Sequence, residues 1–342
     1  MTKKIREAFV FVVVVLMFAA FPWSQSMGQA SIENRLYESP RGLSPVGIDD
    51  SVVLTIPDQA RELPLRVVYP ERVDPERGGR HPVIVLSHGT FSSGKRYDPV
   101  AVYWAARGYV VILPDHVDAN YGVIPKKNED MFRVIRTRVT DMTLVLDSLD
   151  EIERRIPALA GRMDREHLIA AGHSVGTQIA MMVTGLRVRN PTTEEIMQSD
   201  EARFTLLVML SDPGKMALMP ADTWTGSLVP SLLSTGSEDF GLMGDGRRVA
   251  EYQNEILSVG DAPEVDRYLL SIERGDHYFG GLIHRDTDGE PDSEGLAIFN
   301  AVSAAFLDAY AGNDKAALEY LRKADLETAT GGRANLTRER RD

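Results

Sequence analysis

A serine stands between two glycines at the point where the sequence pattern changes from strand to helix. Leu168–Ala171 are apolar, as in a short buried strand, and the residues after Ser174 have the spacing of a packed helix. The stretch between them, Gly-His-Ser-Val-Gly at 172–176, has no residues to spare for a loop. Such a turn raises the serine hydroxyl out of the sheet, and larger residues than glycine would collide at both flanks. The pattern therefore favours a nucleophilic serine over one that only caps a helix.

A serine hydroxyl becomes a nucleophile at neutral pH when a base lies beside it, and histidine is the usual base. The chain has seven histidines. His277 follows the last of the expected strands and precedes Tyr-Phe-Gly-Gly, which places it at the carboxyl end of the sheet together with Ser174. The other histidines precede strands, lie inside the serine turn, stand in a polar stretch or follow other strands. We therefore expect His277 to be the base.

Two aspartates compete for the role of the acid that orients this histidine. Asp239 follows the seventh expected strand in Ser-Thr-Gly-Ser-Glu-Asp-Phe, and Asp212 follows the sixth in Leu-Ser-Asp-Pro-Gly. Either could reach His277, because both strands end at the same edge of the sheet. Asp-Pro-Gly is also ordinary turn chemistry that needs no catalytic reason. We predict Asp239 as the acid and keep Asp212 as the alternative.

An oxyanion formed at this serine would need two backbone donors. One candidate is the N–H of Val175, directly after Ser174 at the start of the expected helix. The other is the N–H of Thr90, because Gly89 lets the backbone approach closely after the third strand. A plain turn at His88-Gly89 is the alternative interpretation.

A cluster of Asp115, His116 and Asp118 follows the fourth expected strand. Ligands packed this closely along the chain rarely close a metal site without help from elsewhere. We therefore predict hydrogen bonding at this rim, with neither a metal nor a cofactor.

The elements that must position these residues follow from the apolar pattern. Helical spacing fills most gaps after the third strand, most clearly from Asp130 to Ile156. Two early strands without a helix between them, then strand–helix alternation, predict an α/β fold with a mostly parallel, eight-stranded sheet covered by helices on both faces. The eight expected strands are Val52–Ile56, Leu63–Tyr69, Pro82–Ser87, Tyr109–Pro114, His167–Ala171, Phe204–Leu210, Val229–Thr235 and Arg267–Glu273.

Five motifs in this order resemble a known family. The stretches PVIVLSHGT, GYVVILPDH, GHSVGT, PSLLSTGSEDF and GDHYFGG are similar to those of α/β-hydrolases, within them the platelet-activating factor acetylhydrolase-like and dienelactone-hydrolase-like esterases. The resemblance covers residues 50–325 and implies the α/β-hydrolase fold, ester hydrolysis and a Ser174–Asp239–His277 triad. Dienelactone hydrolases proper use a cysteine nucleophile, whereas this chain has Ser174 and no cysteine. This departure favours the serine route and argues against a dienelactone substrate.

The remaining segments predict the domain organisation. Basic residues, an apolar run from Ala8 to Trp23 and small residues up to Ala30 predict a secretory signal peptide over 1–30, with an uncleaved N-terminal anchor as the alternative. We expect an N-terminal extension over 31–49, the catalytic domain over 50–326 and a flexible polar tail over 327–342. Export to the periplasm or the medium follows, without stable membrane insertion after cleavage.

Composition limits the partners. The net charge of −12 argues against nucleic acid and anionic membranes, which favour basic surfaces. The sequence therefore predicts an exported serine hydrolase acting on a small-molecule carboxylic ester, of short-chain or lipid type. An amide or polyester hydrolase with the same triad, and a non-catalytic binding member of the fold, are the alternatives.

Overall fold

The computed structural model describes residues 35–56, 60–190, 192–199, 201–211, 229–239 and 265–338. The predicted signal peptide and the alternative acid Asp212 lie outside these residues. No helix in the described part of the chain is long and apolar enough to cross a membrane.

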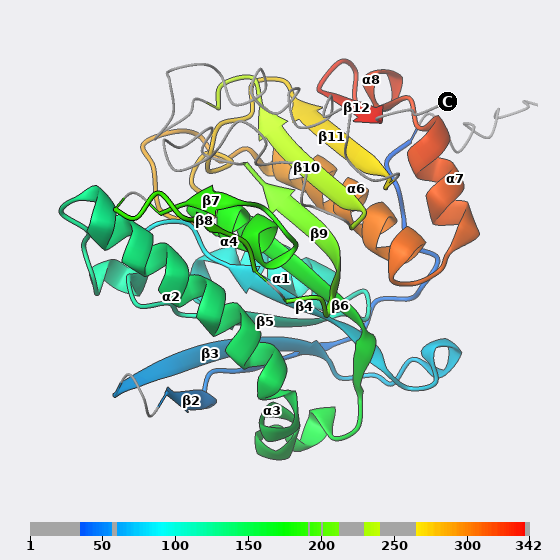
Figure 1. The fold of residues 1–342 in the computed structure, drawn as a ribbon. Coiled ribbons are helices and arrows are strands. Elements are labelled where there is room, and N and C mark those ends of the chain that lie inside the picture. Colours follow the sequence, from blue (N-terminus) through cyan, green and yellow to red (C-terminus); the bar gives the residue numbers. More distant parts are fainter. Residues whose placement is uncertain are drawn as a thin grey trace, which may run out of the picture. The chain divides into compact units, whose positions relative to one another are not determined.

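A large mixed sheet forms the centre of the unit from residue 31 onward (Figure 1). Its strand order is β1-β3-β5-β4-β6-β9-β10-β11-β12, with β2 paired to β3. The six strands from β5 to β11 run parallel, and the pairs at both ends of the sheet are antiparallel. The strands are β1 (Val46–Asp49), β2 (Val53–Ile56), β3 (Arg61–Pro70), β4 (His81–Ser87), β5 (Val110–Pro114), β6 (Met163–His173), β9 (Phe204–Leu210), β10 (Ser231–Gly236), β11 (Arg267–Ile272) and β12 (Ala334–Arg338); β7 (Val188–Arg189) and β8 (Ile196–Met197) pair separately.

Helices cover both faces of the sheet. Because side chains alternate along a strand, Val83 and Val85 of β4 face one layer, while Ile84 and Leu86 face the other. The first layer holds α2 (Asn128–Asp147), α3 (Leu149–Arg155) and α4 (Val175–Val183). The second holds α1 (Asp98–Ala105), α6 (Ser293–Tyr310), α7 (Lys315–Lys323) and α8 (Leu326–Ala329). The short 3-10 helices are η3 (Pro75–Arg77), η4 (Gly94–Tyr97), η5 (Ala119–Tyr121) and η6 (Pro157–Leu159).

The α/β class and the mostly parallel sheet predicted from the sequence are confirmed, and each of the eight expected strands has a counterpart. The single helix expected from Asp130 to Ile156 is divided at Ser148, whose backbone leaves the helical conformation. The sheet also holds ten described strands rather than eight, because β1 and β12 add to its ends.

The C-terminal segment differs from the flexible polar tail that we predicted. α8 and β12 lie within it, and β12 pairs antiparallel with β11. Two of its arginines pair with residues at the starts of other elements: Arg338 binds Asp266, just before β11, at 2.5 Å, and Arg333 binds Asp292, just before α6, at 2.5 Å. The polar composition gave no sign of this regular structure, because ion pairs with residues distant in the chain leave no local signal.

Candidate active site

Ser174 lies in a sharp turn between β6 and α4, at the carboxyl edge of the parallel strands. Its backbone adopts φ 55° and ψ −127°, a conformation that L-residues rarely take. A Cβ on Gly172 would overlap the backbone of Gly176, and one on Gly176 would overlap the carbonyl oxygen of Ser87. Both glycines are therefore required by the close approach of α4 to β6 and β4, as the sequence pattern indicated.

The strained turn is anchored to the neighbouring strand β9. The Ser174 N–H donates to the carbonyl oxygens of Leu210 at 3.1 Å and Ser211 at 2.9 Å. These bonds hold the serine backbone in its unusual conformation, which surrounding structure must stabilise. The serine is nearly buried, with 3% of its surface exposed.

His277 and Asp239 form a hydrogen-bonded pair beside this turn. Nδ1 of His277 lies 2.8 Å from Oδ1 of Asp239, and both side chains are buried. Because a carboxylate accepts, Nδ1 carries the proton and Nε2 of the neutral ring has a free lone pair. Within the described residues Nε2 has no hydrogen-bond partner. This is the protonation pattern that a general base for serine requires.

Ser211 joins the two halves of the site and was missed by sequence reasoning. Its hydroxyl donates to Oδ2 of Asp239 and lies 2.7 Å from Nδ1 of His277, while its carbonyl accepts the Ser174 N–H. Its backbone also has a positive φ of 48°. The one signal in the sequence was its position directly after the sixth expected strand, at the edge where the other site residues gather.

His173 links the base to the loop after β4. Its Nε2 donates to the His277 carbonyl oxygen at 2.8 Å, so its Nδ1 accepts from the Tyr97 hydroxyl at 2.9 Å. The same hydroxyl accepts the Gly89 N–H at 2.9 Å. Burial lowers the pKa of His173 well below its usual value, so the ring stays neutral and this proton arrangement persists.

The two predicted oxyanion donors are the backbone N–H groups of Val175 and Thr90. Val175 is the first residue of α4, and Thr90 follows β4 in the loop that Tyr97 holds. In the described part of the chain, neither N–H donates a hydrogen bond. Unused backbone donors at a helix N-terminus and in a tight loop suit a developing negative charge.

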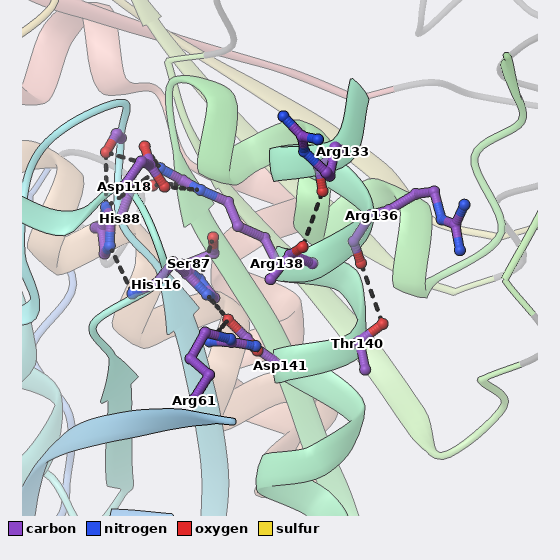
Figure 2. Close-up of polar contacts among 12 residues, drawn as sticks. Arg61, Ser87, His88, His116, Asp118, Arg133, Arg136, Arg138, Thr140 and Asp141 are labelled. Carbon is purple, nitrogen blue, oxygen red and sulfur yellow. Dashed lines mark hydrogen bonds and ion pairs between the residues drawn. The ribbon is translucent and has the colours of Figure 1, made fainter. Parts of the chain in front are cut away.

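The rim cluster after β5 is tied into hydrogen bonds rather than left free. Asp115 accepts the Gly94 N–H at 2.7 Å, His116 binds Asp141, and Asp118 binds Arg138 (Figure 2). No group of three or more metal-ligating residues with suitable geometry occurs among the described residues.

A second serine–histidine–aspartate set lies within this cluster. Nε2 of His116 is 3.0 Å from the Ser87 hydroxyl, and Nδ1 is 2.9 Å from Oδ2 of Asp141 (Figure 2). The His116 and Asp141 side chains have no exposed surface, and Ser87 is fully buried in β4. Substrate could not reach this serine, and the arrangement is a buried hydrogen-bonded network.

Comparison with known proteins does not assign the chain to a family. No protein-family model matches the chain, and no curated protein matches its sequence.

Proposed function

We propose that this chain is a serine esterase with an α/β-hydrolase fold and a Ser174–His277–Asp239 triad. The observation that carries the proposal is the His277 ring, which holds its proton toward Asp239 and whose Nε2 has no hydrogen-bond partner in the described part of the chain, together with the strained backbone of Ser174. Ser174 and His277 are neighbours through two connections: Ser211 contacts both residues, and His173 binds the His277 carbonyl oxygen.

The reaction follows from this geometry. The Ser174 oxygen attacks the ester carbonyl while Nε2 of His277 accepts its proton, and the N–H groups of Val175 and Thr90 stabilise the oxyanion. The imidazolium then protonates the departing alcohol, leaving an acyl group on Ser174. Water deprotonated by His277 then attacks the acyl carbonyl. The imidazolium returns that proton to the departing Ser174 oxygen as the carboxylic acid is released, which restores the free serine and the neutral ring. Asp239 supports the positive charge on the ring in both halves of the reaction.

The substrate class is a small carboxylic ester of short-chain or lipid type. It is supported by the resemblance of five ordered motifs to acetylhydrolase-like esterases. Export through the N-terminal segment and action outside the cytoplasm belong to the same proposal and rest on the sequence of residues 1–30.

The decisive experiment measures hydrolysis of p-nitrophenyl esters of graded acyl length by the purified chain and by Ser174→Ala. We expect turnover by the native chain and a loss of about 10⁴- to 10⁶-fold in the variant, with its circular dichroism unchanged. A fluorophosphonate probe should label Ser174, as identified by peptide mass spectrometry. Ester binding without turnover would favour a non-catalytic member of the fold, and retention of more than a few per cent of activity in the variant would reject Ser174.

A further inference from the structure

A buried arginine in α2 reaches the loop that follows β4. Arg138 has no exposed surface and forms a two-point ion pair with Asp118: Nε lies 2.8 Å from Oδ1, and Nη2 lies 2.6 Å from Oδ2 (Figure 2). Its remaining N–H groups point to backbone carbonyls. Nη1 donates to the His88 oxygen at 2.5 Å, and Nη2 lies 3.4 Å from the Gly89 oxygen.

The bonds made by these carbonyls fix the directions of the adjoining amides. In a trans peptide the C=O and the following N–H point in opposite directions. The peptide between His88 and Gly89 shows this directly, since its oxygen faces Arg138 and its N–H donates to Tyr97 on the other side. In the next peptide, the Gly89 oxygen accepts from the His88 ring at 2.7 Å as well as from Arg138. The Thr90 N–H therefore points away from Arg138.

The ion pair also holds the far side of Thr90. Oδ2 of Asp118 accepts the Phe91 N–H at 3.2 Å, so one ion pair binds the backbone before and after Thr90. Of the three amides from Gly89 to Phe91, only that of Thr90 lacks an acceptor within the described part of the chain.

We propose that the Arg138–Asp118 pair is the positioning device of the oxyanion site: it fixes the peptide planes around Thr90 so that this N–H is presented to the substrate oxygen. The inference rests on the proposed esterase function and assigns the positioning role to two residues outside the triad. Neither side chain touches the substrate.

An arginine suits this role for a physical reason. Its planar fork binds a carboxylate and backbone carbonyls at the same time, whereas a lysine ammonium has no fixed directions. A buried ion pair is weak evidence of a role in stability, because apolar pairs of similar volume often replace such pairs at no loss. Burial alone would raise the pKa of Asp118, but Arg138 lowers it to about 2, so the pair stays charged at neutral pH.

The test compares hydrolysis of an aryl ester with that of its thionoester, in which sulfur replaces the carbonyl oxygen. Sulfur accepts hydrogen bonds poorly, so the oxyanion donors favour the ester over the thionoester. The kcat/KM of the ester divided by that of the thionoester therefore reports how well these donors are aligned. Removal of one such donor typically lowers kcat by about 10²- to 10³-fold. We expect Arg138→Lys to lower the ester rate by at least about 10-fold and to lower the ratio by a similar factor. KM should change little.

The matched control is Arg61→Lys. Arg61 also pairs with a buried carboxylate of α2, Asp141, but the other partner of that carboxylate is the His116 ring rather than the backbone of residues 88–91. The Arg61→Lys variant should leave the ratio of ester to thionoester kcat/KM within about twofold of the native value. Asp118→Asn provides a second variant if Arg138→Lys does not fold, because it preserves shape while weakening the ion pair. Amide hydrogen exchange over residues 88–92 should accelerate in both test variants and not in the control.

The outcomes separate the two proposals. If the native chain hydrolyses the ester while the variants lose rate at an unchanged ratio, the positioning role is wrong and the esterase function stands. Unchanged exchange over residues 88–92 would contradict the positioning role in the same way. If the native chain hydrolyses neither compound, the proposed function fails, and the inference fails with it.

Discussion

At the scale of single residues, the proposed chemistry depends on which carboxylate supports His277. Asp239 is bound to Nδ1 of the ring and is itself bound by the Ser211 hydroxyl. Asp212 lies outside the described residues. We expect Asp239→Asn to lower turnover by about 10⁴-fold, because the imidazole would lose its orienting partner and its charge support. Asp212→Asn, measured in parallel on the same ester, should stay near the native rate. The reverse result would place the acid after β9.

Ser211 should contribute a smaller, separate effect. Its hydroxyl contacts both Asp239 and His277 and takes no part in moving the Ser174 proton. Ser211→Ala removes both contacts, and the net worth of a hydrogen bond is typically about 0.5–1.5 kcal/mol. We expect kcat to fall by about 3- to 10-fold with KM unchanged. Ser234→Ala is the control, since Ser234 is buried in the adjacent strand and bonds to the Met209 carbonyl oxygen. Equal losses in the two variants would show a packing effect instead.

At the scale of elements, the turn at Ser174 depends on the contact between α4 and β4. A methyl group at Gly176 would overlap the Ser87 carbonyl oxygen, and backbone atoms cannot rotate away as a side chain can. We expect Gly176→Ala to lower the free energy of unfolding by about 1–3 kcal/mol, the usual cost of overpacking, and to abolish most activity. Urea denaturation measures the first quantity. Gly42→Ala is the control, because Gly42 has open space around it; a Gly176 variant as stable as that control would contradict the packing argument.

The strands could be predicted from the sequence, whereas residues whose roles depend on distant contacts could not. The strand β9 was predicted to the residue because a short, nearly continuous apolar run is a local signal of a buried strand. Because these strands could be located, the sequence also predicted that Ser174, Asp239 and His277, which each follow a strand, lie at one edge of the sheet. Ser211, Tyr97 and Arg138 were not found, because their roles arise from contacts between segments far apart in the chain. Arg138, for instance, stood in a helix with other arginines, and nothing local marked it as the buried one.

At the scale of the whole molecule, burial of histidines links stability to pH. Burial is the largest cause that lowers the pKa of five histidines: His81, His88, His116, His173 and His284, the last to about 3. Two of them, His88 and His173, hold the loop and the base described above. The neutral form of these rings is therefore part of the folded structure, and the site and the core share the same requirement.

The sign of the effect follows from proton binding. In the unfolded chain these histidines protonate near pH 6.5, whereas in the folded chain they resist protonation. Below about pH 6.5 the unfolded state binds more protons, so the free energy of unfolding falls as pH falls, by at most about 1.4 kcal/mol per pH unit for each histidine. The lowered pKa values of Asp118 and Asp141 add a loss only below about pH 4, the range of free aspartate.

We therefore expect urea denaturation to show stability falling steadily from pH 6.5 to pH 5, before carboxylates titrate. His173→Gln should be less stable at neutral pH, because glutamine replaces the ring imperfectly, yet its stability should fall less steeply with acid, by up to about 1.4 kcal/mol per pH unit. The slope, and not the absolute stability, separates protonation from lost packing. A native chain whose stability stays level or rises between pH 6.5 and pH 5 would show that these histidines are not held neutral by the fold.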